Sequence, residues 1–161
     1  MSTSLTGWHA GVSSIQRKLG YDGPMAMAYT WIESSFPEQH RQFYVRNLPF
    51  IPLTTLDNEG RPWSSIVAGK SGEPGFMQSQ YENELSMELE LWPDDPIVAN
   101  LSPIQKDPDK TILVAGLGIE FPTRRRNKFA GHIFELSSYN YNGNVSRYYR
   151  YIRITANQTI G

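Results

Sequence analysis

Hydrophobic side chains recur at helical spacing in two stretches near the start of the chain. In GVSSIQRKLG, residues 11–20, the apolar positions lie three or four residues apart, and the final glycine is a typical helix C-cap. The stretch PEQHRQFYVRN, residues 37–47, predicts a second short helix, which Leu48-Pro49 brings to an end. The first third of the chain is therefore expected to be helical.

From residue 50 onward the pattern changes to the two-residue alternation of β-strands. FIPLTTLD (50–57) and RPWSSIVAG (61–69) flank the turn NEG and predict a hairpin. LSMELELW (85–92) alternates strictly, with four apolar side chains on one face and an acidic opposite face, which indicates a half-buried antiparallel strand. Three further strand-like stretches are KTILVAGLGIEF (110–121), FAGHIFELSSY (129–139) and SRYYRYIRITA (146–156).

A short helix is expected between the third and fourth of these strands. In DDPIVANL, residues 94–101, Asp94 or Asp95 is suited to the N-cap and Pro96 to the first helical position. Six or so strands with short turns and a few peripheral helices predict a mainly β fold, a closed or nearly closed antiparallel barrel. At 161 residues we expect one domain, with a helical segment at about 8–47 and a barrel at about 48–161.

Composition narrows the possible functions. Charged residues make up 19% of the chain and the formal net charge is −1, so any anion site must be local. The absence of cysteine excludes disulfides, zinc–thiolate sites and a thiol nucleophile. His9, His40 and His132 stand alone, outside metal-ligand spacings, and we expect no metal site. No secretory signal and no apolar run of about 20 residues is present, which predicts a soluble cytoplasmic protein without a membrane partner.

A concentrated positive charge stands out in this nearly neutral chain. Three consecutive arginines and then Lys128 lie in FPTRRRNKFAG (121–131), between two strand-like stretches. Arginine has a planar guanidinium that forms bidentate contacts with phosphate, so a phosphate site on a rigid turn is one interpretation. A solvated basic loop is the general alternative.

Single-stranded RNA binding is a minor alternative for the same cluster, because nearby aromatic rings could stack on bases. The candidate rings are Tyr139, Tyr141, Tyr148 and Tyr149. RNA-binding surfaces usually spread their charge over a whole face, whereas this chain has one short cluster and an acidic stretch, ENELSMELELWPDD (82–95). We therefore expect no nucleic-acid partner.

Several motifs in this order resemble one known family. PFIPLTTLDNEGRPWSSIVAGKSGEPGFM (49–77), an apolar strand and then TRRRNKFAGHI (123–133) resemble the pyridoxamine 5′-phosphate oxidase-like proteins, the flavin-binding split β-barrels. GWHAGVSSIQRKLG (7–20) is similar to the F-H-x-G-E-x-x-x-Q start of one branch, with Val12 where that branch prefers glutamate. The resemblance extends from about Gly7 to the end of the chain.

The resemblance implies a six-stranded antiparallel split β-barrel, a homodimer, and FMN in a cleft at or near the subunit interface. It places one strand along the flavin ring and the basic cluster against the FMN phosphate, with Arg125 and Arg126 as the favoured arginines. The cofactor-binding residues that it implies are Trp63, Ser64, Ser65, Ile66, Thr123, Arg124, Arg125, Arg126, Asn127 and Lys128.

The function that follows is an FMN-dependent oxidoreductase, which uses a reduced nicotinamide or a small organic substrate and has no assigned catalytic side chain. The chain lacks the C-terminal R-L-x-P-type segment that grips substrate phosphate in the oxidase itself. A C-terminally truncated member, a non-catalytic flavin- or ligand-binding domain, and the front module of a larger reductase are the alternatives.

Overall fold

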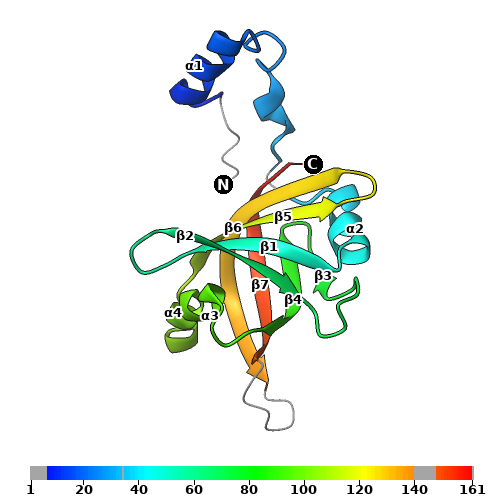
Figure 1. The fold of residues 1–161 in the computed structure, drawn as a ribbon, viewed down its shortest axis with the longest axis vertical. Coiled ribbons are helices and arrows are strands. Elements are labelled where there is room, and N and C mark those ends of the chain that lie inside the picture. The colour runs from blue at the N-terminus through cyan, green and yellow to red at the C-terminus, as the bar shows by residue number, and fades with distance from the viewer. Residues whose placement is uncertain (1–6, 34, 140–147, 161) are drawn as a thin grey trace.

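The computed structural model describes residues 7–33, 35–139 and 148–160. Within these ranges the chain forms one antiparallel sheet of seven strands in the order β2-β1-β5-β6-β7-β4-β3. A pairing between Ala68 and Glu90 joins β2 to β4 and closes six of the strands into a barrel (Figure 1). The strands are β1 Phe50–Leu56, β2 Pro62–Ala68, β3 Met77–Gln78, β4 Glu84–Leu91, β5 Ile112–Glu120, β6 Arg125–Tyr139 and β7 Tyr148–Ile160.

This architecture confirms the predicted mainly β fold with a six-stranded antiparallel barrel and a few short helices. The strict alternation predicted for 85–92 is present in β4, whose four apolar side chains all point into the core. The strand begins at Glu84 and its backbone pairs along its whole length with β7. Alternation is reliable here because one face of the strand is buried and the other is not.

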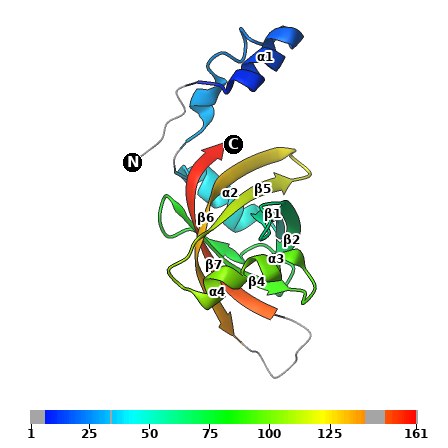
Figure 2. The ribbon, with the colours of Figure 1, turned by 90° about the vertical axis from the view of Figure 1, so that its left-hand side faces the viewer.

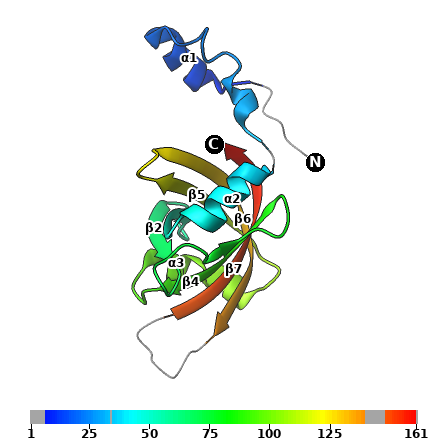
Figure 3. The ribbon, with the colours of Figure 1, turned by 90° about the vertical axis from the view of Figure 1, so that its right-hand side faces the viewer.

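The helices lie outside the barrel. In the described ranges they are α1 Ala10–Leu19, η1 Ala28–Trp31, α2 Glu38–Asn47, α3 Pro96–Asn100 and α4 Ser102–Lys106. The side views show α1 standing above the barrel, with α2 on one side of it and α3 and α4 on another (Figures 1, 2 and 3). The sequence pattern predicts α1, α2 and α3, whereas η1 and α4, which are only one turn or so long, were not predicted.

The caps of the predicted helices are as expected. Gly20 ends α1 in a left-handed conformation with φ of 71°, which a residue without Cβ adopts at little cost. Asp95, and not Asp94, is the N-cap of α3, and its carboxylate accepts a hydrogen bond from the backbone N–H of Ile97 at 3.0 Å. Both ends are encoded by local residues, which explains why they could be predicted.

An aromatic cluster fastens α2 to the barrel. Tyr44 of α2 meets Phe129 of β6 edge to face, with ring centroids 5.7 Å apart. Phe36, just before the helix, contacts both rings in the same way at 5.6 and 5.8 Å. All three side chains are buried, and this packing sets the position of α2 against the first half of β6.

The basic cluster occupies a different element from the one expected. The turn between β5 and β6 consists of residues 121–124, and Arg124 closes it with a positive φ of 59°. β6 begins at Arg125, which pairs with Glu120. Arg125, Arg126 and Lys128 are therefore strand residues rather than turn residues, because the turn needs only four positions to reverse the chain.

Candidate functional site

Strand alternation divides the basic cluster between the two faces of β6. Asn127 is only 1% exposed and points inward, as does Phe129 two residues later. Arg126 and Lys128 occupy the alternate positions, are exposed, and lie on the outer face of the barrel. A strand has a side-chain period of two, so these neighbouring residues cannot all meet one anion.

Arg125 is directed towards α2 rather than towards Lys128. Its guanidinium lies over the ring of Phe43, with the central carbon 4.7 Å from the ring centroid. It also donates a hydrogen bond of 3.0 Å to the backbone carbonyl of Gln39. This cation–π contact and hydrogen bond hold Arg125 against the first turn of α2.

The outer face of four neighbouring strands carries small and hydroxyl-bearing side chains. Ser64 of β2 pairs with Thr54 of β1, Thr54 with Ala115 of β5, and Ala115 with Ala130 of β6. The hydroxyl oxygens of Thr54 and Ser64 are 2.5 Å apart and hydrogen-bonded. Two alanines beside a hydroxyl pair make a flat surface with polar groups at one side only.

A cleft of about 400 Å³ lies over this surface. Its walls are mainly apolar, and among the described residues Lys128 is the one charged side chain that lines it. The lining residues are Ile32, Pro52, Thr54, Ser64, Ala115, Gly116, Leu117, Lys128, Phe129, Ala130, Thr159 and Ile160. The volume and the predominance of apolar side chains are typical of a small-molecule site.

Ser65 does not belong to this cleft. Its side chain is buried on the inner face of β2 and its hydroxyl donates to the carboxylate of Asp95. The contact links β2 to the N-cap of α3, so the hydroxyl has a structural partner. Ile66, next along the strand, is on the outer face with Ser64 and is 71% exposed.

Trp63 belongs to the β1–β2 hairpin end. Its indole N–H donates to a carboxylate oxygen of Asp57 at 2.9 Å. The same carboxylate accepts from the backbone N–H of Arg61 at 2.9 Å, and these bonds hold the pKa of Asp57 well below its usual range, with the Arg61 backbone N–H as the largest cause. Trp63 therefore helps to order the hairpin.

The turn before β6 has its own hydrogen bonds. Glu120 accepts from the hydroxyl of Thr123 and from the side-chain amide of Asn47, the latter at 2.7 Å. These two bonds, followed by the charge of Arg125, lower the pKa of Glu120. Thr123 thus uses its hydroxyl proton within the turn.

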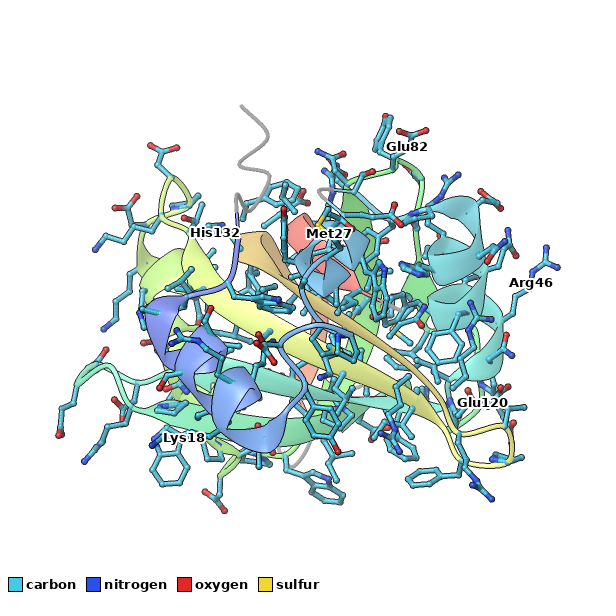
Figure 4. The ribbon with its side chains drawn as sticks, turned by 90° about the horizontal axis from the view of Figure 1, so that it is seen from above. Lys18, Met27, Arg46, Glu82, Glu120 and His132 are labelled. Atoms are coloured by element: carbon cyan, nitrogen blue, oxygen red, sulfur yellow. The ribbon has the colours of Figure 1, made fainter. Side chains whose placement is uncertain are left out.

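Seen from above, Glu120 lies on the same side of the barrel as Arg46 of α2 (Figure 4).

A second hollow, of about 530 Å³, lies between α2 and the start of β6. The residues that line it are Glu38, Gln39, His40, Gln42, Arg125 and Asn127. All of these residues have polar or charged side chains, whereas apolar side chains predominate in the cleft. The second hollow lies on the face of β6 opposite to the cleft. Burial lowers the pKa of His40, Arg125 lowers it further, and Glu33 acts in the opposite direction.

The implied site residues thus separate into groups. Ser64 and Lys128 line the cleft, while Ile66 and Arg126 occupy its face of the barrel. Arg125 and Asn127 line the second hollow. The remaining members, Trp63, Ser65, Thr123 and Arg124, lie in the hairpin end, the inner face of β2 and the β5–β6 turn.

The residues that complete both hollows were not predicted from the sequence. Pro52 and Thr54 could have been found, because alternation in FIPLTTLD places them on the face opposite to Ile51 and Leu53. Ile32 and Ile160 reach the cleft only through the tertiary fold. Of the rings considered for RNA stacking, Tyr141 lies outside the described residues, and so do the side chains of Tyr139, Tyr148 and Tyr149.

Clusters of metal-ligand side chains and long apolar helices are both missing from the described ranges. No group of three or more histidines and carboxylates there is placed to hold a metal ion. None of the helices in those ranges has the length and apolar character required to cross a membrane.

Comparison with known proteins gives a likeness in structure only. No protein-family model matches the chain, and no curated protein matches its sequence. HupZ of Group A Streptococcus is similar with a TM-score of 0.50 at 11% identity, over 77% of this chain and 92% of HupZ. An F420 reductase has a TM-score of 0.49 at 13% identity, over 76% of this chain and 97% of the reductase.

A pyridoxamine 5′-phosphate oxidase-related, FMN-binding protein from Nostoc punctiforme is also similar, with a TM-score of 0.45 at 13% identity. That match covers 75% of this chain and 78% of the Nostoc protein. At these identities the likeness concerns the fold. The chain has an antiparallel barrel fold similar to that of HupZ.

Proposed function

We propose that this protein binds FMN in the cleft on the outer face of β2, β1, β5 and β6, and that it acts as an FMN-dependent oxidoreductase. The observation that supports this best is the cleft itself. Its floor is flat because Ala115 and Ala130 are small, and the Thr54–Ser64 hydroxyl pair lies at one side. A flavin ring needs an apolar slot with a few polar groups in fixed positions.

Lys128 is the residue that we assign to the FMN phosphate, with Arg126 beside it on the same face of β6. A phosphate dianion gains charge-assisted hydrogen bonds from an ammonium or guanidinium group. Arg125 and Asn127, which the sequence resemblance also implied, face the other side of the strand. The geometry therefore favours Lys128 and Arg126 over the pair Arg125 and Arg126.

The remaining cleft residues would hold and orient the ring. One hydroxyl of the Thr54–Ser64 pair donates to the other, which leaves one hydroxyl proton to donate to a ring heteroatom. Pro52 and Leu117 would exclude water from one face. When bound, FMN supplies hydride and electron transfer. Apart from Lys128, which is assigned to the phosphate, no described side chain in the cleft is an obvious acid or base, so the protein would contribute binding, orientation and electrostatics.

A homodimer is part of the proposal. The outer face of the barrel around the cleft exposes apolar side chains, including Ile66 at 71% and Leu113 at 54%. α1 likewise exposes Val12, Ile15 and Leu19. Contiguous exposed apolar residues usually mark an interaction surface. A second copy that covers this face would also shield the flavin from water.

The flavin assignment is tested by a visible spectrum and an FMN titration. We expect a yellow protein or, after FMN removal, quenching of FMN fluorescence on binding. Lys128→Ala should weaken binding by about 10- to 100-fold, the loss expected for a hydrogen bond to a charged group. Arg125→Ala is the matched control and should change affinity by less than about threefold, since the residue faces away from the cleft.

Two results would contradict the assignment. The protein could stay colourless and fail to quench FMN, or Arg125→Ala could weaken binding while Lys128→Ala does not. Reduction of the bound flavin under anaerobic conditions by NADPH or NADH separates an oxidoreductase from a non-catalytic flavin-binding domain. If neither donor reduces the bound flavin, the result would support a non-catalytic flavin-binding function.

A further inference from the structure

The hollow between α2 and β6 has the features of a second ligand site. His40 and Tyr44 lie four residues apart and so share one face of α2. Tyr44 packs on Phe129, and Asn127 is two residues from Phe129 on the same face of β6. This packing brings the first turn of α2 over Asn127 and forms a hollow of about 530 Å³.

Asn127 is the unusual residue in this hollow. Its side chain is 1% exposed, and neither its amide nitrogen nor its amide oxygen has a hydrogen-bond partner in the described part of the protein. His40 Nδ1 and Gln42 Oε1, which line the same hollow, are buried and unpartnered in the described residues as well. Buried polar atoms are almost always hydrogen-bonded, so several unpartnered atoms around one space indicate an occupant.

Arg125 gives the rim of the hollow one positive charge, while the carboxylates of Glu33 and Glu120 act on His40 and Arg125 respectively. Glu38 accepts hydrogen bonds from Arg41 and, at 2.6 Å, from the amide of Gln42, so its negative charge is compensated within α2. Arg125 brings a positive charge to the hollow and is held in place by Phe43 and the Gln39 carbonyl. The interior side chains are otherwise neutral hydrogen-bonding groups.

We propose that this hollow binds a small purine-nucleotide-like molecule, with its phosphate at Arg125 and its base edge on the amide of Asn127. An asparagine amide offers one donor beside one acceptor, which matches the edge of an adenine ring. The guanidinium matches a phosphate. The volume lies within the range of small-molecule sites. The site is separate from the flavin cleft, because it lies on the other face of β6, and it does not depend on the flavin proposal.

The probe is AMP, titrated into the full chain by calorimetry with and without saturating FMN. We expect about one AMP per chain in both conditions, because the two hollows are on opposite faces of the strand. Adenosine tests the base edge without the phosphate, and ribose 5-phosphate tests the phosphate without the base. Each should bind at least about tenfold more weakly than AMP, since each loses one of the two anchors.

Variants separate the two anchors. Asn127→Leu should weaken AMP at least about tenfold, and Arg125→Ala should weaken AMP by a similar factor while leaving adenosine unchanged. Lys128→Ala, in the cleft, is the control and should leave AMP binding unchanged. The side-chain amide signals of Asn127 in a ¹⁵N spectrum of the unmodified protein should shift on AMP addition, and this measurement needs no variant to fold.

Thermal unfolding distinguishes a ligand site from a structural amide. Asn127→Leu replaces unpartnered polar atoms by apolar ones of similar volume, so the ligand-free variant should melt at or above the temperature of the unmodified protein. A fall of several degrees would show a structural amide and overturn the proposal. Three further results would overturn the proposal. They are failure of AMP to bind, displacement of FMN by AMP, and an unchanged affinity of Asn127→Leu for AMP. If the protein binds AMP but not FMN, only the flavin proposal is contradicted.

Discussion

At the scale of single residues, Gly131 shows how closely β6 and β7 approach one another. A Cβ at this position would lie 2.0 Å from the carbonyl oxygen of Thr155 and 2.9 Å from Cα of Ala156. These atoms belong to the backbone of β7, which is held in register by its other pairings. The strand pairing shifts register at this point, between Ala130 and Gly131. Only glycine fits this approach.

Gly131→Ala is therefore expected to destabilise the protein. The backbone of β7 would have to move to admit the methyl group, and overpacking of this kind typically costs about 1–3 kcal/mol or more. Chemical denaturation measures the change in the free energy of unfolding. Gly23→Ala is the matched control, since a Cβ there meets nothing within 4 Å, and its effect should stay within about 0.5 kcal/mol.

His40 should make stability depend on pH. Burial, and then the charge of Arg125, lower the pKa of His40 below its ordinary value of 6.5, although Glu33 opposes the shift. As pH falls below 6.5 the unfolded chain takes up a proton that the folded chain resists, so the free energy of unfolding decreases. Above that value the residue contributes no pH dependence.

The measurement is urea denaturation at several pH values from about 8 down to about 5. The decrease below pH 6.5 should be smaller in His40→Gln than in the unmodified protein, while the two curves should run parallel near pH ~8. Identical slopes below pH 6.5 in both proteins would show that other groups cause the dependence.

At the scale of elements, Asp95 connects a short helix to the barrel. Its carboxylate caps α3 at the backbone N–H of Ile97, and it also accepts from the buried hydroxyl of Ser65 on β2. α3 has only five residues and cannot be stable through its own hydrogen bonds. Its position therefore depends on this carboxylate and on the burial of Ile97.

Asp95→Ala should lower the free energy of unfolding by about 2–4 kcal/mol, which combines the loss of an N-cap with a buried hydroxyl left without its partner. Asp94→Ala removes an exposed neighbouring carboxylate and should change it by less than about 0.5 kcal/mol. Equal effects of the two substitutions in thermal or chemical unfolding would contradict the role assigned to Asp95.

At the scale of the whole molecule, exposed apolar side chains are the basis of the proposed homodimer. Among the described residues, exposed apolar side chains include Ile66 and Leu113 on the outer barrel face and several along α1, which has no buried residue. The turn that contains Glu82 lies on the opposite side of the barrel from β1 and β2, as the view from above shows (Figure 4). A dimer that forms through the outer barrel face around Ile66 would leave this turn outside the interface.

Sedimentation velocity tests the homodimer. We expect the unmodified protein to sediment as a species of twice the chain mass of 18.3 kDa. Ile66→Glu places a charge in the apolar face and should give a monomer, because an unpaired charge is costly to bury. Tyr81→Glu, which changes an exposed aromatic in the turn beside Glu82, should remain dimeric. A monomeric unmodified protein would contradict the proposal.

Much of the fold follows from local sequence. The strict alternation of residues 85–92 identifies β4, and Gly20 and Pro96 mark the end of α1 and the start of α3. Each of these signals acts within a few residues of the backbone that it shapes. The order of hairpin, apolar strand and basic cluster was also sufficient to indicate a split barrel. Local chemistry and motif order therefore determined the class of fold.

Only the tertiary structure decided which residues share a site. The stretch RRRNK is polar throughout, so its alternation leaves no hydrophobic signal, and its members turn towards different hollows. The pairing of Thr54 with Ala115 and the seating of α2 over Asn127 join segments that are far apart along the chain. Such contacts depend on strand register and aromatic packing between distant elements, and no single stretch of sequence carries that information.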